Sequence, residues 1–159
     1  MSGVLDALYR GDRAAAEEHA SGRELDILEA AALGDDERIR GLLADDPTLV
    51  STRSSDGFTA LHYAAFFGTS DAVAVLLQNG SDPSAVARNE MQVQPLHSAA
   101  AVDATETARL LLDAGADPNA RQQGGFRPMD AAVQNGNEEL RELLLERGAE
   151  PSDAARNQA

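Results

Sequence analysis

Cysteine is absent from this chain of 159 residues. Without thiols there is no disulfide framework, no thiolate nucleophile and no cysteine-ligated zinc site. The same absence fits a reducing compartment, so we expect a cytoplasmic location. The first residues, MSGVLDALYRGDR, carry Asp6 inside what would have to be an apolar run, so we expect no signal peptide.

Aromatic residues are scarce, at 4% of the chain, and tryptophan is absent, whereas hydrophobic residues as a whole make up 43%. A core built mainly from alanine, leucine and valine suits closely packed helices better than aromatic-rich strands. Long apolar runs are missing too, because the longest stretch without charge, residues 57–70, is shorter than the roughly 20 apolar residues that cross a bilayer.

Basic residues are also in short supply, since 13 Lys and Arg stand against 27 Asp and Glu and leave a net charge of -14. Binding to phosphate backbones needs clustered Lys and Arg, and anionic membranes attract basic segments. We therefore expect neither a nucleic-acid partner nor a membrane. The acidity favours a basic patch on a protein partner.

The chain does contain an internal repeat with three landmarks. A leucine pair recurs at Leu42, Leu76, Leu111 and Leu144, each followed by a second leucine, with spacings of 34, 35 and 33 residues. A short apolar segment ending in small residues precedes each pair, and a glycine followed by an acidic residue two places on comes after the last three pairs.

Between the landmarks the pattern predicts a helix, a tight turn, a second helix and a long loop. The first helix of each unit is rich in alanine and stops at Gly34, Gly68 and Gly136, where a left-handed residue ends a helix at little cost. Asp103 takes this place in the third unit and is a poorer choice. Helix pairs this short cannot bury their own apolar faces, so the units must stack.

Several segments resemble the ankyrin-repeat family. Residues 57–65, GFTALHYAA, resemble its G-x-T-P-L-H-x-A-A motif, and residues 95–100, PLHSAA, resemble it again. Residues 110–120, LLLDAGADPNA, match L-L-L-x-x-G-A-D-x-N-A. The run ARQQGGF at 120–126 resembles short, stand-alone bacterial ankyrin proteins. The resemblance implies an all-α solenoid of stacked antiparallel helix pairs with β-hairpin-like finger loops.

We place the repeats at about 20–53, 54–88, 89–121 and 122–154, inside a stack that covers residues 24–153. Residues 1–23 are expected to form an irregular helical cap with two short helices around Gly11, and residues 154–159 a frayed tail. The polar ends of such a stack predict a monomer.

Two departures from the family pattern carry expectations. The first repeat has Leu25–Leu28 where T-P-L-H would stand, as expected of a terminal unit. The third repeat has Gln92 where its neighbours have Gly57 and Gly125, and two additional residues fall between Asp82 and Pro95. We therefore expect its finger loop to be longer and differently shaped at the tip.

No residue pattern indicates catalysis, a cofactor or a metal. His62 and His97 stand at the family's T-P-L-H position, where each ring is expected to bond loop backbone. Equivalent positions in neighbouring repeats lie about 8–10 Å apart, too far for two zinc ligands at about 2 Å. The carboxylates lie on predicted helix surfaces, and no phosphate-binding or nucleophile motif is present. We expect no enzyme.

The resemblance implies a binding site for another protein on the concave face, lined by finger tips and by the ends of the first helices. The matching helix-end residues include Leu33, Phe66, Phe67, Ala101, Val102, Gln134 and Asn135, and the matching finger residues include Asp56, Phe58, Glu90, Met91, Val93 and Phe126. We expect an apolar stripe with an acidic rim that takes a partner segment with apolar side chains among basic ones. Alternatively, Phe58 and Phe67 pack against neighbouring fingers and merely close the groove.

Other functions remain open at this point. The chain can be a regulatory factor that masks one specific enzyme, a self-assembling scaffold, or a binder of a small molecule or a metal. The last needs a deep pocket with converging polar groups, and a closed cavity near His62 and His97 would favour it.

Overall fold

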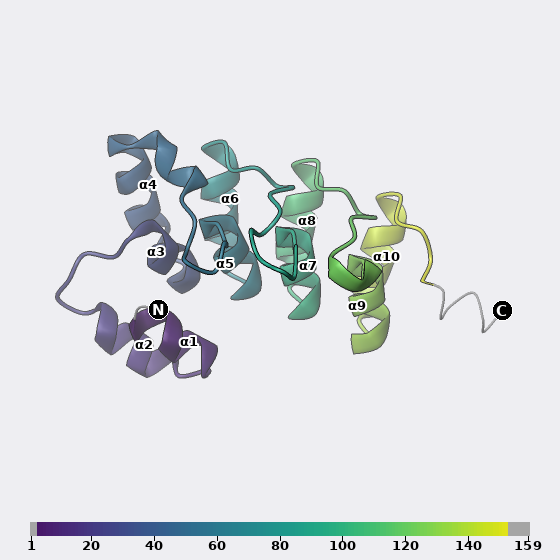
Figure 1. Cartoon of the computed structure of the whole chain (residues 1–159), viewed down its shortest axis with the longest axis horizontal. Coiled ribbons are helices and arrows are strands. Elements are labelled where there is room, and N and C mark those ends of the chain that lie inside the picture. The colour runs from purple at the N-terminus through teal and green to yellow at the C-terminus, as the bar shows by residue number, and fades with distance from the viewer. Residues whose placement is uncertain (1–2, 153–159) are drawn as a thin grey trace.

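The computed structural model describes residues 3–152 of the chain. Apart from one isolated bridge between Arg53 and Thr59, this part is helical and contains no strand. Its ten α-helices, in chain order (Figure 1), are α1 (Gly3–Tyr9), α2 (Arg13–Ala20), α3 (Ile27–Leu33), α4 (Asp36–Asp45), α5 (Ala60–Phe66), α6 (Ser70–Gln78), α7 (Pro95–Ala101), α8 (Thr105–Asp113), α9 (Pro128–Asn135) and α10 (Glu138–Glu146). Two 3-10 turns, Pro47–Ser51 and Gln123–Gly125, complete the regular structure.

The helices from α3 onward form four antiparallel pairs that stand side by side in a row (Figure 1). The first helices of the pairs, α3, α5, α7 and α9, make one layer, and α4, α6, α8 and α10 make the other. One continuous apolar core runs between the layers from Val4 to Ala149. The all-α solenoid predicted from the sequence is confirmed.

Alanine permits the close stacking of the first helices. Ala64 on α5 and Ala99 on α7 are completely buried, and so small a side chain lets neighbouring helices approach to about 8–10 Å. Each first helix ends at a left-handed residue, and Asp103 takes this conformation with φ 57° although it is not a glycine. Its carboxylate accepts hydrogen bonds from the amides of Asn135 and Asn137 in the next pair, which offsets the local strain.

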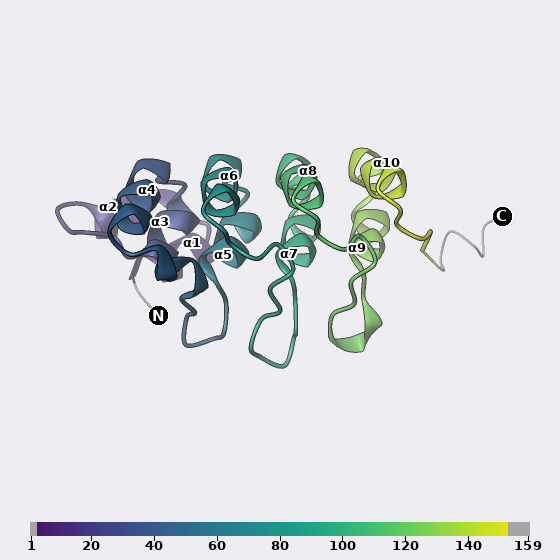
Figure 2. The same ribbon diagram turned by 90° about the horizontal axis from the view of Figure 1, so that it is seen from above.

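Finger loops project from the same edge of the helical layers (Figure 2). The second-repeat finger is closed by a bond from the Ser54 amide to the Phe58 carbonyl, and the third by a bond from the Ala87 amide to the Val93 carbonyl. The third finger is therefore two residues longer, as predicted. Gln92 nevertheless adopts φ 52°, the left-handed conformation of Gly57, so the backbone at that residue keeps its neighbour's shape.

Capping geometry corrects the alignment of the first repeat. Asp26 caps α3 and pairs reciprocally with Glu29, just as Thr59 caps α5 and pairs with His62. The segment that matches T-P-L-H is therefore residues 26–29, and the assignment to Leu25–Leu28 was one residue too early. The difference arises because the first repeat has one residue fewer between Asp26 and the buried Ala30 than the second has between Thr59 and Ala64. Aligning the buried alanines therefore displaces the cap by one residue.

At the N-terminal end, α1 and α2 pack together, and α1 lies against α3 (Figure 1). Residues 154–159, which we expected to fray, lie outside the described part of the chain. The positions of the helices do not fix the repeat boundaries, which stay a prediction. Among the described helices, none has the length and hydropathy needed to cross a bilayer.

Candidate protein-binding surface

Two buried histidines connect neighbouring units. The Nδ1 atom of His62 accepts from the Thr59 amide at 3.2 Å, so Nε2 carries the hydrogen and donates to the Val93 carbonyl at 2.9 Å. His97 makes the same two kinds of bond one unit later, with the Gln94 amide as donor and the Ala120 carbonyl as acceptor at 2.9 Å. Ala120 precedes the tip of its finger, whereas Val93 follows the tip. The expected structural role of the two rings, bonding loop backbone, is confirmed.

The same bonds determine the chemistry of these rings. Burial lowers the pKa of His62 to about 4 and also lowers the pKa of His97, so both are neutral at pH 7. Both nitrogens of each ring are used in bonds to the chain. Neither ring therefore offers a free lone pair to a metal, and within residues 3–152 there is no cluster of His, Asp and Glu with metal-binding geometry.

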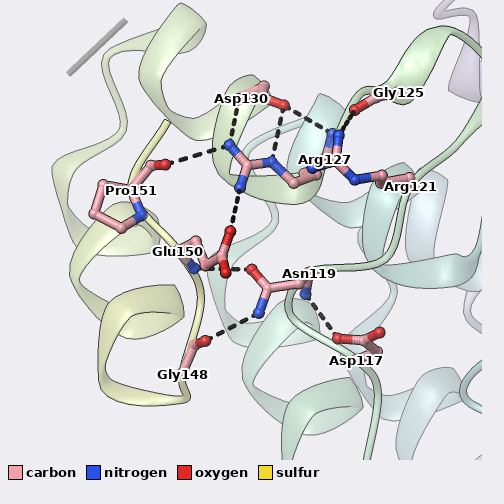
Figure 3. A network of polar contacts seen from close by, with 9 residues as sticks. All are labelled: Asp117, Asn119, Arg121, Gly125, Arg127, Asp130, Gly148, Glu150 and Pro151. Carbon is pink, nitrogen blue, oxygen red and sulfur yellow. Dashed lines mark hydrogen bonds and ion pairs between the residues drawn. The ribbon is translucent and has the colours of Figure 1, made fainter. Parts of the chain in front are cut away.

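The terminal units use ion pairs at the position of the histidines. Glu29 in the first unit is buried and its Oε1 lies 2.6 Å from Nη2 of Arg23. In the last unit, Asp130 pairs with the buried Arg127 at 3.4 Å (Figure 3). Arg127 also donates to the Pro151 carbonyl at 3.3 Å. This bond connects the chain segment after α10 to the start of α9.

Asn119 adds a second tie at this end (Figure 3). Its Nδ2 donates to the Gly148 carbonyl at 3.0 Å, and its Oδ1 accepts from the Glu150 amide at 2.8 Å. The side chain of Asn119 in the third unit thus bonds backbone groups of the fourth unit. The histidines connect the inner units in the same way, by side-chain bonds to the backbone.

Five aromatic rings gather where the N-terminal helices meet the second unit. Tyr9, at the end of α1, lies 5.3 Å from Phe67 and 5.7 Å from Phe66 between ring centroids. Phe58 on the finger lies 6.0 Å from Tyr63 on α5. These separations are typical of favourable aromatic pairs, so the cluster fixes α1 against α5.

Beside this cluster lies a partly open hollow of about 380 Å³, which we call the aromatic hollow. Its walls include the rings of Tyr9, Phe58, Tyr63 and Phe66 and the side chain of Met91, with His62 and His97 at its base. A second hollow of about 310 Å³, the amide hollow, follows along the groove and is lined by Phe126, Gln134 and Asn135 among others. His97, Ala101 and Gln122 line both, so the hollows form one continuous trough.

Comparison with known proteins now decides the family. The family model described as Ankyrin repeats (3 copies) matches residues 27–122 and 86–155, which together cover most of the chain. This chain belongs to the ankyrin-repeat family. Ankyrin repeats are protein–protein interaction modules, and the family is generally non-enzymatic.

Curated relatives share parts of this ankyrin-repeat chain. BCL-6 corepressor-like protein 1 of Homo sapiens is 35% identical over 106 residues, which is 67% of this chain and 6% of that protein. Ankyrin repeat and SOCS box protein 16 of Mus musculus is 40% identical over 102 residues, 58% of this chain and 22% of that protein. Cyclin-dependent kinase 4 inhibitor B of Mus musculus is 49% identical over 59 residues, 37% of this chain and 45% of that protein. The chain therefore spans less than half the length of each.

The ankyrin stack separates the predicted binding residues into three groups. Phe58, Phe66, Met91, Val93 and Ala101 come together around the aromatic hollow, and Phe126, Gln134 and Asn135 line the amide hollow with Ala101. Leu33, Asp56, Phe67, Glu90 and Val102 line neither hollow. Val93 is only 6% exposed, so it forms wall rather than contact surface. Phe67 packs on Tyr9 at the end of α1, whereas the alternative interpretation expected it to pack against a neighbouring finger.

Two wall residues escaped the sequence reasoning. Tyr9 belongs to the N-terminal cap, far from the second repeat along the chain, so no local pattern places it at the groove. Tyr63 follows His62 directly after the T-P-L-H segment, where the repeat motif alone accounts for it. The rarity of tyrosine was the available signal, because the chain has just two. In the structure the two rings contact each other within the aromatic cluster.

Proposed function

We propose that this chain binds a partner protein through the concave groove formed by the finger loops and the first helices. The observation that supports the proposal is the gathering of exposed apolar side chains around the trough, where Tyr9, Phe66, Met91 and Phe126 are between 37% and 55% exposed. Contiguous exposed apolar surface of this kind marks interaction sites. Aromatic anchors in a partly enclosed setting are what binding hot spots contain.

The charge of the chain defines the preferred partner further. Asp56 and Glu90 are exposed near the tips of the second and third fingers, and the whole chain carries a net charge of -14. A field of this sign accelerates association with a positively charged surface and disfavours acidic competitors. We therefore propose a partner segment that presents apolar side chains among basic ones.

Two further functions share this surface. A regulatory factor that masks one specific enzyme would use the same groove and differ only in the identity of its partner. A binder of an apolar small molecule is favoured by one observation, because the aromatic hollow, at about 380 Å³, falls in the usual size range of ligand pockets. Small-molecule sites are usually enclosed and contain converging polar groups. The aromatic hollow is open on one side, and both nitrogens of each histidine are already bonded, so a protein side chain is favoured as its occupant.

The test begins with affinity capture from the source cell, followed by calorimetry with the purified partner. Met91 and Phe126, both more than half exposed, are changed together to alanine. The loss should be on the order of 2 kcal/mol. Leu145→Ala is the matched control, because Leu145 is 37% exposed like Phe66 but lies on α10 in the other helical layer. Replacing Phe66 and Phe67 instead would also loosen α1.

Equal affinities for the wild-type chain and the Met91/Phe126 variant would disprove groove binding. A loss of the same size in Leu145→Ala would locate the interface in the second helices instead.

A further inference from the structure

We infer that the aromatic hollow receives one apolar side chain of the partner segment, and that Tyr9 from the N-terminal cap forms the wall that makes this position selective. The inference rests on the proposed function. It adds that the groove recognises an apolar side chain and that the N-terminal cap takes part in this recognition.

The interior of the hollow favours an uncharged occupant. Four aromatic rings and a methionine form its walls, and the two histidines at its base are held neutral by burial and by bonds to the backbone. No carboxylate lines it, so a cation placed there would lose its hydration and gain only cation–π contacts with the rings, without a paired charge. An aliphatic or aromatic side chain would bury apolar surface on both sides at no such cost.

Tyr9 distinguishes this hollow from the rest of the trough. Tyr9 is 44% exposed while its ring packs against Phe66 and Phe67, so part of the side chain is held and part remains accessible. Burial, with Tyr63 beside it, raises the pKa of Tyr9, which places the hydroxyl in poorly hydrated surroundings. The amide hollow has no equivalent wall and is lined by Gln134 and Asn135, so it should tolerate polar side chains.

The two hollows also suggest a spacing. They belong to successive helix pairs, which lie about 8–10 Å apart, and an extended chain advances about 3.3 Å per residue. A segment that crosses the groove in extended form would thus reach the amide hollow about three residues from its apolar anchor.

Charge around the anchor should be positive. Asp56 is exposed on the second finger, two residues before Phe58 in the wall of the hollow, although it does not line the hollow itself. Among the basic side chains of the fingers, Arg88 lines a separate pocket with Ser81 and Asp82, and Arg121 donates to the Gly125 carbonyl at 3.2 Å. A Lys or Arg beside the apolar anchor would therefore be attracted to the Asp56 carboxylate next to the hollow.

The probe is a displayed library of random 12-residue peptides, selected on the immobilised full chain. Synthetic versions of the selected peptides are then titrated by fluorescence anisotropy. The selected sequences should share one large apolar residue with a Lys or Arg within three positions. Changing that apolar residue to alanine should weaken binding at least tenfold, and so should Tyr9→Ala and Met91→Ala in the protein. Tyr9→Phe should bind nearly as well as the wild type, because the ring makes the wall.

Met91→Ala keeps the test informative if Tyr9→Ala disturbs the fold of α1, since Met91 lies on a finger and is 53% exposed. Selected peptides that ignore both changes but depend on Phe126 would overturn this inference and leave the proposed function intact. Selected peptides without an apolar anchor, or with acidic neighbours, would overturn it as well. A library that yields no binder would overturn the proposed function together with the inference.

Discussion

The Nε2 atom of His62 lies 2.9 Å from the carbonyl oxygen of Val93, a residue 31 positions later in the chain. The ring belongs to α5, and the carbonyl belongs to the finger of the next unit, so one side chain sets the distance between two repeats. The other ring nitrogen caps its own helix through Thr59. A single imidazole therefore couples local helix formation to the stacking of neighbours.

Replacing His62 with asparagine should lower the free energy of unfolding by about 2 kcal/mol, because the shorter side chain leaves buried polar groups without a partner. The Val93 carbonyl keeps its bond from the Ala87 amide, which limits the loss. Urea denaturation followed by circular dichroism measures the effect. The same change at His19, an exposed residue of the cap, serves as control and should cost little.

The contribution of His62 should also depend on pH. Burial lowers its pKa from 6.5 to about 4, so between these values the unfolded chain binds a proton that the folded chain does not. Stability from this group is complete above pH 6.5 and is lost as the pH falls toward 4. Between pH 7 and pH 4 the wild type should lose about 3 kcal/mol of stability relative to His62→Asn. This loss exceeds its advantage of about 2 kcal/mol at pH 7, so the variant should be the more stable of the two at pH 4. A constant difference over this range would show that folding does not lower the pKa of His62.

Gly57 should resist substitution for two reasons that can be separated. It has φ 84°, and a Cβ atom there would collide with the backbone of Arg88. Gly80 has a similar φ of 91° with nothing near its Cβ direction. Gly80→Ala should therefore cost only the conformational strain, about 1–2 kcal/mol, and Gly57→Ala clearly more. Equal melting temperatures for the two variants would mean that the fingers move apart freely.

Arg127→Leu should destabilise the C-terminal end of the stack. Arg127 is 5% exposed and pairs with Asp130 and Glu150, and removing one partner of a buried pair costs about 3–5 kcal/mol. Glu150 is 64% exposed, so solvent screening reduces the expected loss to about 2 kcal/mol. Hydrogen exchange at the Glu150 amide should accelerate as well. Arg141→Ala, which removes an exposed pair with Glu138, is the control and should change stability by less than about 0.5 kcal/mol.

The sequence was sufficient to predict the solenoid because repetition appears directly in the spacing of Leu42, Leu76, Leu111 and Leu144. The longer third finger was predictable for the same reason, since two additional residues between fixed landmarks must extend a loop. Asp103 was correctly placed at a left-handed position, although its bonds to Asn135 and Asn137 required coordinates.

The walls of the groove were less predictable. Tyr9 reaches the second unit only through the packing of α1 on the stack, and long-range packing of an irregular cap has no periodic signature. Val93 was expected at the surface because it lies on a finger, yet its side chain is buried and its carbonyl accepts a hydrogen bond from His62. Site residues that depend on loop geometry are thus harder to infer than core residues that depend on period.

The position of Tyr9 has a thermodynamic consequence. Its ring is shared between the inner wall of the hollow and the junction that holds α1 in place, so ligand occupancy and fraying of the first turns are linked equilibria. Suppose that a ligand binds more tightly when Tyr9 is packed against α5 than when α1 is frayed. At saturation it must slow amide exchange in α1 by the ratio of these two affinities. If the proposed groove binding holds, amide exchange in α1 would therefore report, without any label in the groove, whether the groove is filled.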